Sequence, residues 1–229
     1  MAFYGVKRLV YRAFCRMVFS EQWQYRFDRQ VFFNRAFAAL AMNGIQGDYV
    51  EFGSHGCRTF SMAYEESRRK GIAPRLWAFD SFKGLPESSE SKDQHPRWGA
   101  GDMATPLDVF DHLCRREGIP KSEYRVVPGY YSESLPGIVD GDEPREICLA
   151  YVDCDLYSST KEVLGFLSSR IRHGMIIAFD DWHLWSSNAQ SGEKSAFEEF
   201  CLSQTKWKFQ PYLPIGWHGH SFVVELASC

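Results

Sequence analysis

No C-x-x-C pair occurs in the sequence, although seven of its 229 residues are cysteine. An odd number of scattered cysteines argues against a disulfide framework or a zinc site and favours a protein of the reducing cytoplasm. Long apolar runs are also missing, because none approaches the roughly 18 residues that a membrane-spanning helix needs. The formal net charge of -3 gives no reason to expect nucleic acid or an anionic membrane as a partner.

Two phosphate-binding patterns are absent as well. The turn EFGSHGCRTF, residues 51–60, contains Gly53 and Gly56 but not the G-x-G-x-x-G pattern of dinucleotide-binding enzymes. A glycine-rich loop followed by lysine is also missing, which disfavours a phosphotransfer or hydrolytic enzyme that would use Mg²⁺. The turn stays compatible with a ligand that lacks a pyrophosphate group.

Short apolar segments alternate with helical patterns from residue 48 onward. We expect strands over 48–53, 75–80, 124–129, 146–153 and 175–181, and a closing strand pair over 206–213 and 220–226. The helical patterns cover 57–71, 105–118, 132–139, 159–174 and 192–204. Thr105 is expected to cap the second of these helices, and Gly174 to end the fourth. This alternation predicts an α/β fold with an open, mainly parallel sheet.

Residues 1–46 are predicted to form a helical extension that precedes the main domain, residues 47–229. Basic residues interrupt every candidate signal-peptide core, so the start of the chain is interpreted as an amphipathic helix. Its apolar stripe contains Phe3, Val6, Val10, Phe14 and Met17. A lid or dimer contact, a membrane-surface helix and a helix docked on its own domain remain alternatives.

A long segment without periodicity, residues 81–104, follows the second expected strand. It is rich in Ser, Gly, Pro and charged residues. An irregular loop of more than about 15 residues in a compact domain is commonly functional. Because ligands of parallel sheets bind at the carboxyl ends of the strands, we interpret this loop as a mobile element of an active site, with a plain surface insertion as the alternative.

Acidic residues follow four of the expected strands. They are Glu51, Asp80, Asp153, Asp155, Asp180 and Asp181. Each could instead cap a helix or form a turn, and for Asp155 this alternative weighs as much as a role in a site. Together at one sheet edge they need a compensating cation or hydrogen-bond donors. Asp80 suits the ribose hydroxyls of a nucleotide, and Asp153 with Asp180 and Asp181 can supply oxygen ligands to Mg²⁺.

The chain resembles the macrocin O-methyltransferase family in five blocks: GDYVEFG, AFDSFKGLP, RVVPGYYSESLP, YVDCDLYSSTKEVL and GMIIAFDDW. They lie between residues 47 and 182 in the family's order. The resemblance implies a Rossmann-like class I methyltransferase fold, with a seven-stranded, mainly parallel sheet, helices on both faces and an antiparallel terminal strand. It also implies an enzyme that uses S-adenosylmethionine and Mg²⁺ to methylate a hydroxyl group of a sugar or another small natural product.

The resemblance also implies roles for individual residues. The cofactor-binding set is Glu51, Gly53, Ser54, Thr59, Asp80, Ser81, Tyr130 and Asp153, and the metal ligands are Asp153, Asp180 and Asp181. Cys57 departs from the family pattern, which usually has glycine there, and a side chain at this position could narrow the approach of the cofactor.

The catalytic pair that we infer is Asp153, acting through the metal, and His95 as general base. His183 is the rival base, and a loop histidine is more often simply exposed to solvent. A cofactor-binding regulatory protein without turnover is the alternative function.

Overall fold

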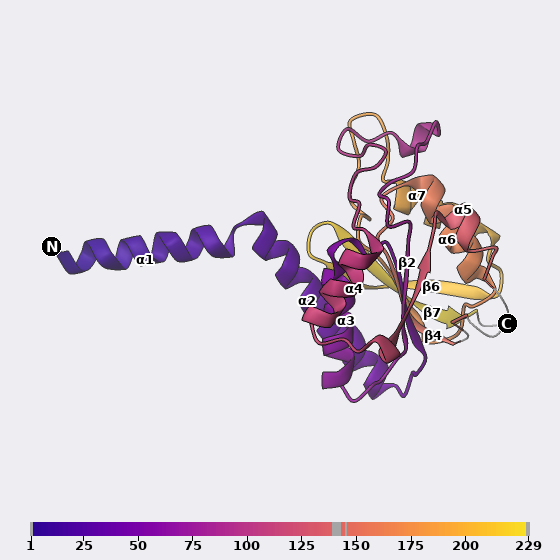
Figure 1. Cartoon of the computed structure of the whole chain (residues 1–229), viewed down its shortest axis with the longest axis horizontal. Coiled ribbons are helices and arrows are strands. Elements are labelled where there is room, and N and C mark those ends of the chain that lie inside the picture. The colour runs from indigo at the N-terminus through magenta and orange to yellow at the C-terminus, as the bar shows by residue number, and fades with distance from the viewer. Residues whose placement is uncertain (1, 139–142, 145, 228–229) are drawn as a thin grey trace.

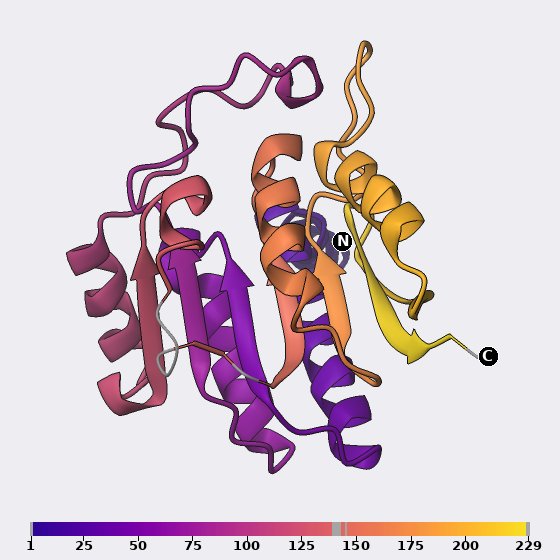
Figure 2. The ribbon, with the colours of Figure 1, turned by 90° about the vertical axis from the view of Figure 1, so that its right-hand side faces the viewer.

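Within the residues that it describes, 2–138, 143–144 and 146–227, the computed structural model forms a seven-stranded sheet with the order β3-β2-β1-β4-β5-β7-β6 (Figure 2). The strands are β1 (Asp48–Phe52), β2 (Leu76–Asp80), β3 (Tyr124–Pro128), β4 (Ile147–Val152), β5 (Ile176–Phe179), β6 (Trp207–Ile215) and β7 (Gly219–Leu226). Strands β1 to β5 are parallel, and β7 is antiparallel to β5 and β6. The predicted fold class is confirmed.

Helices cover both faces of this sheet (Figure 1). Helices α2 (Glu21–Met42), α3 (Arg58–Arg69) and α4 (Leu107–Arg116) lie on one face. The other face is covered by α5 (Tyr131–Ser134), α6 (Tyr157–Ser168) and α7 (Gly192–Ser203). Each face has its own apolar core, so every residue of β4 is buried, as its unbroken apolar sequence predicts.

Two local predictions about caps are wrong, and one alternative is ruled out. Pro106, not Thr105, is the N-cap of α4, and the Thr105 hydroxyl instead accepts a hydrogen bond from the backbone N–H of Gly56 (3.1 Å). Helix α6 ends at Ser168, and Gly174 serves the turn into β5, where its φ of +83° suits glycine. Asp155 does not cap α6 either, because Leu156 is the N-cap.

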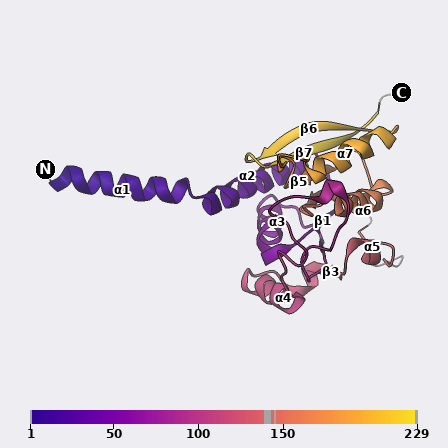
Figure 3. The ribbon, with the colours of Figure 1, turned by 90° about the horizontal axis from the view of Figure 1, so that it is seen from above.

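Two helices form the N-terminal extension, and they differ in their packing. Helix α1 (Ala2–Val18) projects away from the rest of the protein (Figures 1 and 3). Val10, Phe14 and Met17 on it are more than half exposed, which contradicts docking of α1 on its own domain. The side chains of Phe3 and Val6 lie outside the described part, as does residue 139 of the expected 132–139 helix. Helix α2, in contrast, contributes several phenylalanines to the core.

The segment 81–104 rises beyond the carboxyl edge of the sheet (Figure 2). Its regular structure is one 3-10 helix, Ser91–Asp93, and the chain is described throughout this interval. Buried Asp93 accepts hydrogen bonds from the backbone N–H and the hydroxyl of Ser158 (2.9 and 2.5 Å) and thereby ties the loop to the start of α6.

No helix within the described residues is long and apolar enough to cross a membrane.

Candidate active site

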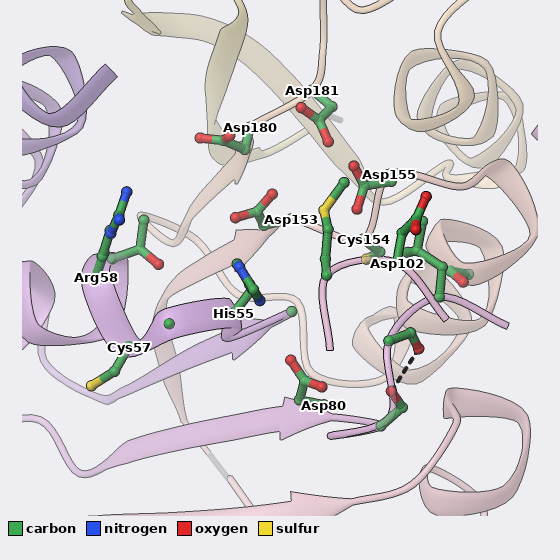
Figure 4. Close-up of a pocket in the computed structure, with 18 of the residues that line it drawn as sticks. His55, Cys57, Arg58, Asp80, Asp102, Asp153, Cys154, Asp155, Asp180 and Asp181 are labelled. Carbon is green, nitrogen blue, oxygen red and sulfur yellow. Dashed lines mark hydrogen bonds between the residues drawn. The ribbon is translucent and has the colours of Figure 1, made fainter. Parts of the chain in front are cut away.

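The strand ends bring the predicted acidic residues to one edge of the sheet, beside a cavity of about 1010 Å³ (Figure 4). Its walls come from α2, the β1–α3 turn, the ends of β2, β4 and β5, and the loop after β2. Ligand pockets in proteins usually have volumes of roughly 300–1,000 Å³, so this cavity lies at the upper end of the range for small-molecule sites.

Asp153, Asp180 and Asp181 converge as the sequence predicted. One carboxylate oxygen from each lies within 4.8 Å of the others. Asp153 is half-buried and faces the cavity, whereas Asp180 and Asp181 are buried. Burial, and then the neighbouring acids, raises the pKa of Asp153 and of Asp181 well above the usual range. The cluster is therefore costly without a cation.

Asp180 differs from its neighbours because it already has a cationic partner. Arg29 on α2 forms a two-point ion pair with its carboxylate, in which Nε donates to Oδ1 at 2.9 Å and Nη2 donates to Oδ2. The hydroxyl of Tyr151 also donates to Oδ1. Burial acts to raise the pKa of Asp180, but Arg29 and these donors hold it below the usual value.

The donor set fits a hard divalent cation. All three groups are carboxylates, which Mg²⁺ prefers, and the Asp181 Oδ2 atom is buried without a hydrogen-bond partner among the described residues. The positions of these groups are supported by Glu193 at the start of α7, which accepts hydrogen bonds from the N–H groups of Asp181 (2.8 Å) and Cys154 (3.2 Å). A divalent cation would thus be held by Asp153, Asp180 and Asp181.

The opposite end of the cavity is organised by Asp80 at the end of β2. Its carboxylate accepts hydrogen bonds from the N–H groups of Ser54 (2.7 Å) and Phe82 (2.6 Å), so it joins the β1–α3 turn to the start of the loop. Of the predicted cofactor residues, those that line the cavity are Gly53, Thr59, Asp80, Ser81, Tyr130 and Asp153. Carboxylate oxygens have spare acceptor capacity beyond these two bonds, so Asp80 can still accept from a ligand hydroxyl.

Glu51 and Ser54 lie behind this surface rather than on it. Glu51 is fully buried and accepts hydrogen bonds from Tyr49 and from the Thr59 hydroxyl (3.0 Å). Burial raises its pKa to about 8. The buried Ser54 hydroxyl has no hydrogen-bond partner among the described residues. Glu51 therefore stabilises the β1–α3 turn from inside the protein. Its position at the end of a strand in the sequence does not show that it lies behind the cavity surface.

Backbone geometry makes the turn between β1 and α3 tight. Gly53 has a φ of +90°, and a Cβ there would lie 1.9 Å from the carbonyl oxygen of Asp153. Cys57 also has a left-handed φ of 60°, as its place in a glycine-favouring turn requires. Its thiol lies 3.3 Å from the thiol of Cys114 on α4 and points away from the acidic residues (Figure 4).

Neither candidate base lines the cavity. His95 lies in the 81–104 loop and packs on Trp98, with 4.0 Å between the ring centroids. His183 follows Asp180 and Asp181 in the sequence and is partly exposed. The loop wall instead includes Trp98. His55, which the sequence did not single out, lies inside the cavity among Asp80 and Asp153 (Figure 4).

The His55 side chain is fixed by a hydrogen bond between Nδ1 and the Thr105 hydroxyl (2.8 Å). Thr105 lies about fifty residues further along the chain, so no sequence pattern indicates this contact. Arg29 and Glu193 were missed for the same reason, because each meets the strand ends only through the fold.

This sheet order, with an antiparallel β7 and a cavity at the carboxyl edge, defines the class I methyltransferase fold. The solved structures agree. Calicheamicin methyltransferase CalS11 superposes with a TM-score of 0.70 at 20% identity, covering 91% of this chain and 82% of that one. The O-methyltransferase NovP superposes with a TM-score of 0.67 at 20% identity, covering 86% and 79%. At these identities the likeness shows the fold.

The sequence comparison is more specific. The family model described as macrocin-O-methyltransferase (TylF) matches residues 26–202, and the chain belongs to that family. A tetracenomycin-type rhamnosyl 4'-O-methyltransferase of Streptomyces olivaceus is 31% identical over 146 residues, 61% of this chain and 54% of that protein. Mycinamicin III 3''-O-methyltransferase of Micromonospora griseorubida is 26% identical over 156 residues, 61% and 57%. The chain thus spans a little over half the length of these curated relatives.

Proposed function

We propose that the protein is an S-adenosylmethionine-dependent, divalent-metal-dependent O-methyltransferase that acts on a hydroxyl group of a sugar or another small natural product. One observation carries the proposal. The three carboxylates that can hold a cation lie on the same cavity as Asp80 and the β1–α3 turn, where the cofactor is expected. A methyl donor and an acceptor hydroxyl can therefore meet inside one site.

The cofactor half of the proposal assigns roles to the turn and to Asp80. Asp80, which its bonds to Ser54 and Phe82 hold in place, would accept hydrogen bonds from the ribose hydroxyls. Gly53 and Thr59 would form the surface against the methionine moiety, and Tyr130 and Ser81 would contact the adenosine part. Glu51 keeps Thr59 oriented through its hydrogen bond.

The acceptor half of the proposal uses the acidic trio, by which we mean Asp153, Asp180 and Asp181. A Mg²⁺ ion there would lower the pKa of the acceptor hydroxyl and orient it towards the methyl group. Asp153 is more exposed to the cavity than Asp180 and Asp181, so an acceptor could contact it directly. The loop 81–104 excludes water when it closes over the site.

The general base is assigned from the sequence. His95 remains the assigned base, with His183 as rival, and either must move to reach the cavity. The pH–rate profile of His95→Ala decides the assignment. Loss of its acidic limb supports His95, and an unchanged profile removes the assignment.

The acceptor class rests on the relatives, which are named as methyltransferases of sugars on natural products. Two further parts of the proposal concern the whole chain. We place it in the reducing cytoplasm from its scattered cysteines, without nucleic acid as a partner. We also propose a homodimer in which the exposed apolar stripe of α1 is covered by a second copy. Sedimentation of Phe14→Asp should then show a monomer, and an unchanged mass would contradict the dimer.

Thermal unfolding with S-adenosylhomocysteine, with Mg²⁺ and with EDTA tests the proposed sites. A ligand at a hundred times its dissociation constant stabilises the protein by about 2.7 kcal/mol. We expect a shift with the cofactor product and an additional shift with Mg²⁺ that Asp153→Asn removes. Radiolabelled methyl transfer to pooled hydroxyl compounds then tests turnover. Cofactor binding without any transfer would instead support the regulatory alternative.

A further inference from the structure

Helix α2 makes a direct contact with the acidic trio through a single side chain. Arg29 is the cation that the described residues place against these acids, and 151 residues separate it from Asp180 in the sequence. Its side chain is 21% exposed and that of Asp180 is 1% exposed. A two-point ion pair at this depth replaces much of the solvation that Asp180 has lost.

The same carboxylate is one of the three that would hold a divalent cation. Its oxygens already accept from Arg29 Nε, Arg29 Nη2 and the Tyr151 hydroxyl. A carboxylate has about four acceptor positions, so at most one stays available while Arg29 is in place. A guanidinium beside a divalent cation would also be repelled by it.

Arg29 is itself part of a packed unit on α2. Its guanidinium lies over the ring of Tyr25, 5.1 Å from the centroid. Tyr25 in turn packs on His218, with 4.5 Å between the ring centroids, and His218 Nδ1 donates to the backbone carbonyl of Asp180 at 2.7 Å. Arg29 and Tyr25 thus tie α2 to Asp180 and His218, and the same helix lines the cavity with Gln22, Tyr25, Arg26, Arg29 and Gln30.

We infer that Arg29 is a built-in counter-ion that competes with the divalent cation for Asp180 and couples metal binding to the position of α2. In the metal-free protein Arg29 neutralises Asp180 and holds α2 against the strand ends. When Asp153, Asp180 and Asp181 hold a cation, Arg29 gives up part of this ion pair. The part of α2 that lines the cavity, where we expect the acceptor to bind, then becomes free to move. The inference rests on the proposed metal dependence, and it makes metal binding the step that prepares the acceptor pocket.

Titration calorimetry with Mn²⁺ on the full chain tests the competition. We expect Arg29→Gln to bind Mn²⁺ about tenfold more tightly than the unmodified protein, a coupling of ordinary size for linked sites. Arg26→Gln is the matched control, because Arg26 lies on the same helix and lines the same cavity but is exposed and has no ion pair among the described residues. Its affinity for Mn²⁺ should change less than twofold.

A second measurement follows α2 itself. Hydrogen exchange of the amides around residues 25–30 should accelerate when Mn²⁺ is added to the unmodified protein. In Arg29→Gln these amides should already exchange rapidly and should not respond. Arg29→Lys, which keeps the charge but cannot form the two-point pair, should give intermediate values and serves if the Gln variant does not fold.

The outcomes separate the two proposals. If the unmodified protein and Arg29→Gln bind Mn²⁺ equally, or if the variant binds more weakly, the competition is refuted and Arg29 only positions Asp180. If Mn²⁺ binds neither protein, the metal dependence fails together with the inference. Binding of Mn²⁺ to Arg29→Gln alone would support the inference in its strongest form.

Discussion

The two ends of the cavity use acidic residues in opposite ways. At the cofactor end, Asp80 and Glu51 receive hydrogen bonds from their own surroundings, namely two backbone N–H groups for Asp80 and two hydroxyls for Glu51. At the metal end, Asp153 and Asp181 lie close together with Asp155 beside them, and among the described residues an ion pair compensates only Asp180. The cofactor end is thus preorganised by the chain, whereas the metal end would need an added cation to balance its charge.

The largest expected effect is at the metal end. Asp181→Asn removes a ligand, so we expect methyl transfer to fall at least roughly a hundredfold, since a Lewis-acid cation contributes several kcal/mol. The fold should tolerate the change, because a group with a raised pKa is replaced by a neutral one of the same shape. Activity with and without EDTA measures this, together with the unfolding midpoint. Asp102→Asn, an exposed acid on the loop wall, is the control that should stay active.

Asp80→Asn should show the reverse pattern at the cofactor end. The amide cannot accept from both N–H groups, so one buried donor loses its partner at a cost of about 1–3 kcal/mol. We expect the unliganded protein to be destabilised and its affinity for S-adenosylhomocysteine to fall, with affinity for Mn²⁺ unchanged. Denaturant unfolding and calorimetry measure these quantities. A stable variant with normal cofactor affinity would contradict the comparison.

Glu51 gives the cofactor end a specific pH dependence. Its pKa rises from an ordinary 4.5 to about 8 in the folded protein, so the folded state keeps a proton that the unfolded chain has released. Stability linked to Glu51 is therefore full below pH 4.5 and declines as the pH rises towards 8. Relative to Glu51→Gln, the unmodified protein should lose about 1 kcal/mol per pH unit in this window. If the free energy of unfolding depended on pH in the same way in both proteins, the raised pKa of Glu51 would be refuted.

The smallest effect is expected at Cys57. Its left-handed backbone costs about 1–2 kcal/mol relative to glycine, and its thiol packs against Cys114. Cys57→Ala keeps the strain and loses the contact, so we expect a loss of about 1 kcal/mol. Cys57→Gly relieves the strain and should be nearly neutral. Since the thiol points away from the acids, both variants should keep their affinity for the cofactor. A large gain in cofactor affinity in Cys57→Gly would show that the side chain obstructs the cofactor.

The strand ends were the predictable part of this site. Five parallel strands bring their carboxyl ends to one edge wherever the helices lie, so Asp80, Asp153 and Asp180 could be grouped from the sequence. Contacts made by other elements could not be predicted. Three side chains reach the sheet edge from elsewhere: Arg29 comes from α2, Glu193 from α7, and His55 from the turn that is hydrogen-bonded to Thr105. Their placement depends on packing between segments that are far apart in the sequence.

Sequence was also least informative where a helix has no partner. The stripe on α1 predicts amphipathic packing but not its target, and the fold leaves that helix projecting from the domain. Cap assignments failed at Thr105 and Gly174 because each residue serves a contact outside its own helix. Local propensity is overridden at such positions by tertiary contacts.

Gly53 determines how the two ends relate. A Cβ at this residue would lie 1.9 Å from the carbonyl oxygen of Asp153, so any larger residue would have to push the ends of β1 and β4 apart. Under the proposed function, the distance between the methyl donor and the receiving oxygen would therefore be set by the main chain and not by adjustable side chains. Variation in α2 or in the 81–104 loop can then alter which molecule is accepted, while the transfer distance stays constant.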